Sequence, residues 1–189
     1  AIAVLAGDAL LSFAPQLIID KSVLPSDIVL RVLKEFTSSA GAYQLIAGQV
    51  ADIESEEGKG KLNDSDEETL KFIHTNKTAV LFKLALKTGA IIAGASDDKI
   101  KEMEDFGQAF GLAFQIYDDI MDEISTFAEL GKTIGKDKEA GKLTYVTLYG
   151  LDKARVKVHE LISNAHKIID KYNSDIFNSI LDKIESKVR

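Results

Sequence analysis

Apolar residues recur at helical spacing along most of this chain, and no segment alternates strictly between apolar and polar residues for the length of a sheet strand. Spacings of three and four residues predict amphipathic helices. Only 2 of the 189 residues are Pro, the residue that interrupts helices most strongly. A chain of this length can bury a core within one domain. We therefore predict an all-α fold with a single domain.

Composition excludes several classes of function. The 30 acidic and 23 basic residues give a net charge of −7, so a nucleic-acid-binding surface is not expected. An acidic protein can still bind a polyanion when metal ions lie between the protein and that ligand. The absence of Cys rules out disulfides and thiolate metal sites and fits a cytoplasmic location. Charged or amide residues interrupt the longest apolar runs, so we expect no membrane insertion.

The expected helices follow one another with short loops. The first begins within an apolar run, without Met and without a helix-start signal, which indicates that something upstream is missing. The helix after Asp97 is apolar on nearly all sides between Phe106 and Tyr117, so it should lie centrally in the bundle. Helices are expected at 1–19, 26–54 (with Gly41 and Gly48 inside it), 65–94, from 97 onward, for one turn after Thr126, and at 144–172 and 175–188.

The sharpest feature is an acidic cluster at the end of that apolar helix. Asp118 and Asp122 lie one turn apart on the same helix face, with Asp119 beside them. Three such carboxylates repel one another unless a cation joins them, and hard oxygen ligands suit Mg²⁺, which also binds substrate phosphates. A solvated, acidic helix end is the alternative interpretation. The buried approach and Gln115 favour the metal site.

Two basic segments could serve a phosphorylated ligand. Lys132, Lys136, Lys138 and Lys142 crowd a glycine-rich loop after the acidic cluster, where their charges would complement diphosphate oxygens. Taken alone, these lysines are better explained by an exposed loop that keeps the protein soluble. Lys77 and Thr78 interrupt an apolar helical pattern, so they either point into a polar cleft or, for Lys77, extend to solvent. His74 is expected at the surface, and Asp52 either faces the cleft or ends its helix.

Taken in order, these segments resemble the trans-isoprenyl diphosphate synthases (polyprenyl synthetases), of the bacterial farnesyl/geranylgeranyl type. The resemblance covers almost the whole chain. The matching pieces are Leu5-Ala6-Gly7-Asp8-Ala9-Leu10, Gly48-Gln49 with Asp52, Phe72-Ile73-His74 with Lys77-Thr78, Phe114-Gln115 with Asp118-Asp119-Ile120-Met121-Asp122, and Gly131-Lys132 with Gly135-Lys136-Asp137 and Lys142.

The resemblance implies a fold, a reaction and roles for individual residues. The fold would be a helical bundle around a central cavity, usually as a homodimer. The reaction would condense dimethylallyl or geranyl diphosphate with isopentenyl diphosphate into a longer trans-prenyl diphosphate, farnesyl diphosphate above all. Mg²⁺ would be the cofactor, with about three ions per active site of the complete enzyme.

By position, the family's second metal motif would be Asp118, Asp119 and Asp122, with Asp118 as the direct ligand. Lys77, Lys132 and Lys142 would bind the allylic diphosphate. Catalysis would involve Lys77, Thr78, Gln115 and Lys132. Apolar walls from residues such as Phe82, Phe110 and Phe114 would exclude water from the carbocation.

One departure from the family's pattern matters. The family's first aspartate-rich motif and the arginine pair after it should precede Leu5, and they are absent. We therefore expect a truncated polyprenyl synthetase domain over residues 1–189, corresponding to the C-terminal two-thirds of a synthase, that is inactive alone. The alternative is a non-catalytic regulatory or partner subunit of a prenyl diphosphate synthase. Such subunits usually lose site residues, which this sequence keeps.

Overall fold

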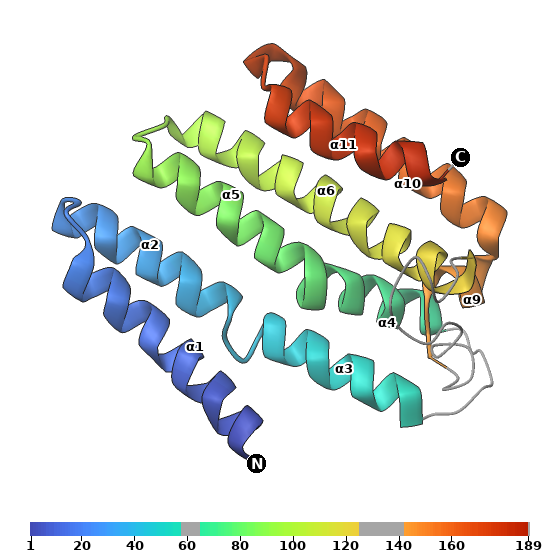
Figure 1. The fold of residues 1–189 in the computed structure, drawn as a ribbon, viewed down its shortest axis with the longest axis horizontal. Coiled ribbons are helices and arrows are strands. Elements are labelled where there is room, and N and C mark those ends of the chain that lie inside the picture. Colours follow the sequence, from blue (N-terminus) through green and yellow to red (C-terminus); the bar gives the residue numbers. More distant parts are fainter. Residues whose placement is uncertain (58–64, 125–141, 189) are drawn as a thin grey trace.

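The computed structural model of the chain describes residues 1–57, 65–124 and 142–188. Within these ranges the regular elements are all helices, laid side by side as shown in Figure 1. The prediction of an all-α fold is confirmed.

The N-terminal part forms three helices, α1 (Ile2–Lys21), α2 (Ser26–Ser39) and α3 (Leu45–Glu57). The prediction of one unbroken helix from 26 to 54 is wrong, because the chain turns between α2 and α3. Gly41 lies in this turn, where a Cβ would collide with the carbonyl oxygen of Thr37. A residue without Cβ is therefore needed where the helix stops.

The next helix is continuous but not uniformly α-helical. It consists of α4 (Asp66–Ile73), the π-helix η1 (His74–Ala79) and α5 (Val80–Ile92). Gly94 has a positive φ of 69° and ends it, as predicted. The π-helical turn was not predicted; such turns are rare and occur often at functional sites.

The C-terminal half begins with the long helix α6 (Asp97–Ile124). Gly150, with a φ of 86°, interrupts the helix that we predicted to run from 144 to 172. The elements after residue 142 are α9 (Tyr145–Tyr149), α10 (Leu151–Ile169), the 3₁₀ turn η2 (Asp170–Tyr172) and α11 (Asp175–Val188). The one-turn helix predicted after Thr126 lies outside the described residues.

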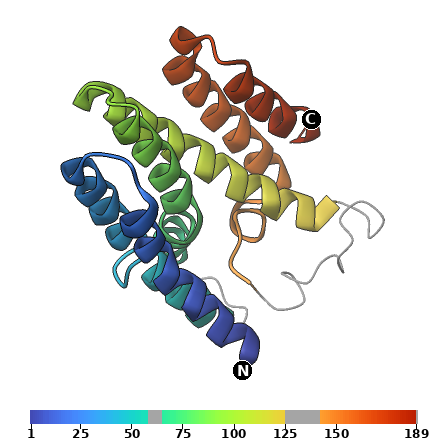
Figure 2. The ribbon, with the colours of Figure 1, turned by 60° about the vertical axis from the view of Figure 1, so that its left-hand side comes forward.

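Helix α6 lies between α5 and α10 (Figures 1 and 2), and α11 packs against both α10 and α6. Its buried side chains include Phe106, Ile116 and Ile120, which are at most 2% exposed. They form one hydrophobic core with α10 and α11 residues such as Val158 and Leu181. The predicted central position of this helix is confirmed.

Two glycines let α3 and α6 approach the π-helix closely. A Cβ on Gly48 of α3 would lie 2.5 Å from the backbone nitrogen of Lys77. A Cβ on Gly111 of α6 would lie 2.6 Å from the Cα of Ala79. Real Cβ atoms do not come this close to backbone, so both positions need glycine for η1 to fit between the two helices.

Helix α1 lies at the edge of the bundle against α2 (Figures 1 and 2). It is long and apolar enough to cross a membrane by length and composition, and none of its residues is buried. Covered helices of soluble proteins pass the same test. The absence of membrane insertion stays a prediction.

Candidate active site

The carboxylates at the end of α6 differ in exposure. Asp118 is exposed, whereas Asp119 and Asp122 are only 6% and 7% exposed. Burial, and then the neighbouring Asp118 carboxylate, raise the pKa of Tyr117. The cluster therefore has one solvent-facing acid and two acids inside the protein.

Asp119 is in contact with groups from three elements. Its Oδ1 accepts a hydrogen bond from Gln115 Nε2 at 3.0 Å, one turn earlier on α6. Its Oδ2 accepts from the backbone N–H of Tyr145 at 2.8 Å, at the start of α9. His74 Nε2 of the π-helix lies 3.4 Å from the same oxygen. Asp119 thus ties α6 to η1 and α9.

Thr78 and Gln115 meet across the interface between η1 and α6. The Thr78 hydroxyl donates to Gln115 Oε1 at 2.5 Å, so the two predicted catalytic side chains are in direct contact. Together with the Gln115–Asp119 bond they form a continuous chain, Thr78–Gln115–Asp119. The structure brings together these three of the predicted site residues.

Lys77 points to the other side of the π-helix, where its ammonium group pairs with Asp52 of α3. The Asp52 side chain is 9% exposed and that of Lys77 is 24% exposed. Of the two alternatives for Asp52, the structure therefore supports an inward-facing carboxylate. Lys77 keeps enough exposure to reach a ligand.

The three phenylalanines predicted to form apolar walls lie close to Thr78 or Gln115 in the sequence, and their side chains pack on one another. Phe82 of α5 meets Phe110 of α6 edge to face, with ring centroids 4.9 Å apart. Phe114 lies 5.2 Å from Phe82 and remains 38% exposed. This aromatic cluster follows the same α5–α6 seam as the hydrogen-bonded chain and offers an apolar surface.

The predicted lysine loop is only partly described. Lys132, Lys136 and Lys138 lie outside the described residues. Lys142 is partly buried and leads into α9, and its carbonyl oxygen accepts a hydrogen bond from the Thr147 hydroxyl at 3.2 Å. A capping box of Thr144 and Thr147 starts that helix. It fixes the backbone beside the Tyr145 N–H that reaches Asp119.

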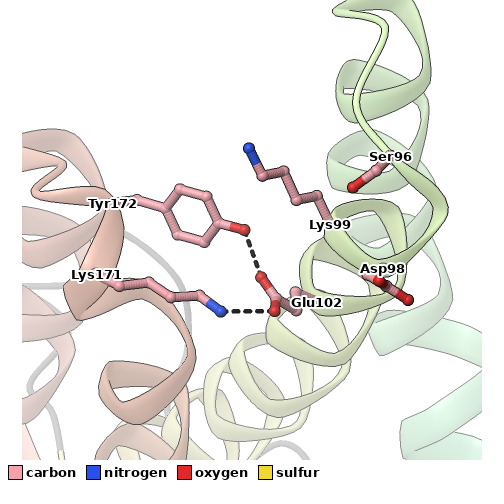
Figure 3. Close-up of a pocket in the computed structure, with 6 residues that line it drawn as sticks. All are labelled: Ser96, Asp98, Lys99, Glu102, Lys171 and Tyr172. Carbon is pink, nitrogen blue, oxygen red and sulfur yellow. Dashed lines mark hydrogen bonds and ion pairs between the residues drawn. The ribbon is translucent and has the colours of Figure 1, made fainter.

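A shallow pocket of about 460 Å³ opens at the opposite end of α6 (Figure 3). In it, Glu102 accepts hydrogen bonds from Lys171 Nζ, at 2.5 Å, and from the Tyr172 hydroxyl. These bonds lower the pKa of Glu102, with the Lys171 bond as the largest cause. At the rise of an α-helix, Glu102 lies about 24 Å along α6 from Asp118, and the pocket shares no residue with the site above.

Sequence reasoning missed one residue and one contact of the site. His74 was expected at the surface, but it is 5% exposed and lies against Asp119. It follows buried Leu70 by four residues, and this helical spacing would have placed it on the inner face. The Asp52–Lys77 pair joins residues 25 positions apart, and no local pattern indicates it.

The donor chemistry at the end of α6 fits Mg²⁺ shared with a ligand. Within the described residues no group of three or more His, Cys, Asp or Glu side chains is close enough to enclose a metal ion. Mg²⁺ seldom requires such a group, since it usually keeps waters and binds one or two carboxylates plus phosphate oxygens. Asp118 and Asp122, one turn apart, are two carboxylates of that kind.

Comparisons with known proteins show the family of the chain. The family model for polyprenyl synthetase matches residues 1–184. Geranylgeranyl pyrophosphate synthase 7 of Arabidopsis thaliana is 41% identical over 180 residues, which cover 95% of this chain and 51% of that protein. Dimethylallyltranstransferase of Fischerella ambigua is 42% identical over 167 residues, covering 88% and 47%. The chain thus spans about half the length of these curated relatives.

Solved structures show the same likeness. A geranyltransferase of Helicobacter pylori, crystallised with magnesium and isoprenyl diphosphate, superposes with a TM-score of 0.77 at 30% identity. The match covers 98% of this chain and 58% of that one. Family model, relatives and fold coincide over nearly the whole chain. The chain belongs to the polyprenyl synthetase family.

Proposed function

We propose that this chain carries the diphosphate- and cation-binding end of a Mg²⁺-dependent trans-prenyltransferase. The reaction joins an allylic diphosphate, dimethylallyl or geranyl diphosphate, to isopentenyl diphosphate. The observation that carries the proposal is the Thr78–Gln115–Asp119 hydrogen-bonded chain, which connects the acidic end of α6 to the aromatic α5–α6 seam. This chain supports the proposal because it joins the predicted catalytic side chains Thr78 and Gln115 to an acidic helix end and to an apolar surface.

Each group has a part in this reaction. Asp118, Asp122 and, by the family pattern, Asp119 are the candidate Mg²⁺ ligands, and Lys77, Lys132 and Lys142 would bind the allylic diphosphate. Bound Mg²⁺ would offset the negative charge that grows on the departing diphosphate. The oxygens of Thr78 and Gln115 would stabilise the allylic cation, and Lys77 and Lys132 the leaving group. Phe82, Phe110 and Phe114 would keep water away from the cation.

The finer parts of the proposal are the product and the assembly. We propose farnesyl diphosphate as the product, in line with the likeness to a bacterial geranyltransferase. Several relatives are named geranylgeranyl synthases, which makes a C20 product the competing outcome. We also propose a single domain, a homodimer, about three Mg²⁺ ions per site and a cytoplasmic location.

The test is condensation of isopentenyl diphosphate with dimethylallyl and geranyl diphosphates by the full-length protein, with chain-length analysis of the products. We expect a C15 product that disappears with EDTA. Asp118→Asn should lower kcat/KM by about 100-fold or more, because it removes a carboxylate ligand of the Mg²⁺ that would offset the charge on the departing diphosphate. Asp98→Asn, which changes an exposed aspartate at the other end of α6, is the matched control and should keep full activity.

The outcome also separates the two functional classes. A C20 product would correct the chain length while supporting the prenyltransferase. If the folded full-length protein makes no product by itself but restores activity to a second synthase subunit, it is a regulatory partner. The described residues offer no observation that favours this second function.

A further inference from the structure

We propose that Asp119 and His74 are positioning residues that fix the direction of hydrogen bonding through Gln115 to Thr78. The inference rests on the proposed function and deepens it. It assigns Asp119 to the support of the two catalytic side chains and leaves the metal-facing role to the exposed Asp118.

The burial and contacts of Asp119 carry the first step. Its carboxylate is almost completely enclosed, and both oxygens are engaged by protein donors, Gln115 Nε2 on one side and the Tyr145 N–H on the other. Asp118, the adjacent acid, is exposed. Neighbouring residues of a helix point about 100° apart, so the two carboxylates face different surroundings. Asp119 therefore faces the protein interior.

The chemistry of the carboxylate gives the second step. An ionised carboxylate only accepts hydrogen bonds, so Gln115 must present its NH₂ group to Asp119. The amide oxygen of Gln115 then faces Thr78, whose hydroxyl has to donate its proton to it. Amide orientations are assigned from such networks, and here an acceptor-only group fixes the assignment.

The direction of these hydrogen bonds determines which atoms of Thr78 are available to a substrate. Because the Thr78 proton is committed to Gln115, the Thr78 oxygen keeps its lone pairs for other contacts. Lone pairs of this kind stabilise positive charge, whereas an O–H or N–H aimed the same way would oppose it. Asp119 thus determines which atoms Thr78 and Gln115 offer to a cation.

His74 provides the support from the π-helix. Its Nε2 lies 3.4 Å from Asp119 Oδ2, the oxygen that also accepts from Tyr145, and the ring is 5% exposed. The wider turn of η1 places His74 against Asp119 and Thr78 against Gln115, on the same neighbouring helix. His74 holds the carboxylate in the orientation that the network requires.

Asp119→Asn tests the direction of the network in the full-length protein. The oxygen of the introduced amide can accept from the Tyr145 N–H, so its NH₂ group would face Gln115. The Gln115 amide then turns over and donates to Thr78, which keeps the bonds but reverses them. We expect kcat to fall about 10- to 100-fold, as for other supporting residues. KM for the allylic diphosphate and the Mg²⁺ concentration for half-maximal activity should change less than about twofold.

The double variant Gln115→Glu with Asp119→Asn restores the original direction. The carboxylate introduced at position 115 accepts both from the Thr78 hydroxyl and from the NH₂ group introduced at position 119, while the oxygen of that new amide accepts from Tyr145. We expect at least about threefold recovery of kcat over Asp119→Asn alone. Gln115→Glu alone sets two carboxylates against each other and should be the least active of the three.

His74 is tested by a conservative pair of variants. His74→Ala should lower kcat without changing KM for the allylic diphosphate, and His74→Gln, which keeps a side-chain N–H, should recover part of the loss. Unchanged kcat in His74→Ala would overturn the role of His74. No difference between the two variants would overturn it as well.

An NMR measurement that does not depend on catalytic turnover tests this inference independently of the proposed function. In protein labelled with ¹⁵N on Gln side chains, the Gln115 signal is identified by its loss in Gln115→Ala. We expect it to shift in Asp119→Asn and to remain in place in Asp98→Asn. An unshifted signal, or a Mg²⁺ requirement raised as in Asp118→Asn, would overturn the positioning role. Absence of any condensation by the wild type would instead reject the proposed function alone.

Discussion

At the scale of single residues, the site depends on two buried aspartates on opposite sides of the π-helix. Asp52 of α3 pairs with Lys77, and Asp119 of α6 lies against His74. Each acid faces a side chain that would be costly to bury alone, since a charged or polar group taken from water needs a partner. The two contacts therefore define how η1 presents Lys77 and Thr78.

Asp52→Asn should reduce the free energy of unfolding by about 1–3 kcal/mol, because it leaves the Lys77 ammonium without its carboxylate. The loss should fall below that of a fully enclosed pair, since Lys77 is 24% exposed. Urea denaturation of the full-length protein measures it. The control Asp98→Asn should stay within about 0.5 kcal/mol, and equal stabilities of the two variants would contradict the role of the pair.

At this scale the sequence indicated which residues matter better than it indicated what they touch. Gln115 and Asp119 lie four apart on one helix, so their contact follows from helical geometry. The contacts of Asp52 with Lys77 and of Asp119 with Tyr145 depend on packing between separate helices. Local periodicity carries no information on such pairs.

At the scale of the elements, glycine contacts decide how closely α6 packs on the π-helix. Gly111→Ala should lower stability by about 1–3 kcal/mol, because the new Cβ would stand 2.6 Å from the Cα of Ala79. Gly89→Ala in α5 is the matched control, since nothing lies within 4 Å of its Cβ position. There the better helix propensity of Ala should add up to about 1 kcal/mol. Thermal unfolding of both variants checks this; destabilisation by both, or by neither, would contradict it.

The Glu102 contact with Lys171 and Tyr172 joins the start of α6 to the 3₁₀ turn η2 and predicts a dependence on pH (Figure 3). Hydrogen bonds from Lys171 and Tyr172, with Lys99 nearby, lower the folded-state pKa of Glu102 from its usual 4.5. Its stabilising contribution is therefore present above pH 4.5 and is lost as pH falls through the lowered value. Glu102→Gln should lack this acid-side loss.

Melting temperatures of wild type and Glu102→Gln between about pH 3 and pH 7 measure the effect. The wild type should be the more stable protein near neutral pH, and the difference should shrink toward the acid end. Asp98→Asn, at an exposed position on the same helix, controls for the loss of one negative charge. A difference that stays constant with pH would contradict the assignment.

Element positions were largely predictable because apolar spacing and Gly94 mark them. The break near Gly41 and the π-helix at His74–Ala79 were not. The π-helix spans only six residues, and its stability comes from the helices packed around it. The π-helix, which carries predicted site residues, was thus the part of the fold least predictable from the sequence.

At the scale of the whole molecule, helix α1 leaves an apolar surface uncovered. None of its residues is buried, and Leu10 is 69% exposed. Large exposed apolar patches mark interaction sites. In the proposed homodimer, this surface would form part of the contact between the subunits.

Leu10→Lys should therefore weaken association of the full-length protein, shifting its mass by light scattering toward that of one subunit. Val156→Lys on α10 is the control, since Val156 is 67% exposed but does not belong to α1. It should leave the mass unchanged. Equal behaviour of the two variants would place the subunit contact elsewhere.

The overall architecture followed from the sequence, because the apolar stretch of α6 predicted its central position in the bundle. The family resemblance added the reaction. The chain spans about half the length of its curated relatives, and helical periodicity carries no information on the other half.

The central claim is that Mg²⁺ and an allylic diphosphate meet at the end of α6. The most direct test is a crystal structure of the full-length protein with Mn²⁺ in place of Mg²⁺ and an unreactive thio-analogue of the allylic diphosphate. We predict an anomalous peak about 2.1 Å from a carboxylate oxygen of Asp118 or Asp122, shared with diphosphate oxygens. Asp119 should still contact Gln115 and Tyr145. Metal and diphosphate bound elsewhere, with Asp118 and Asp122 facing only water, would contradict the account.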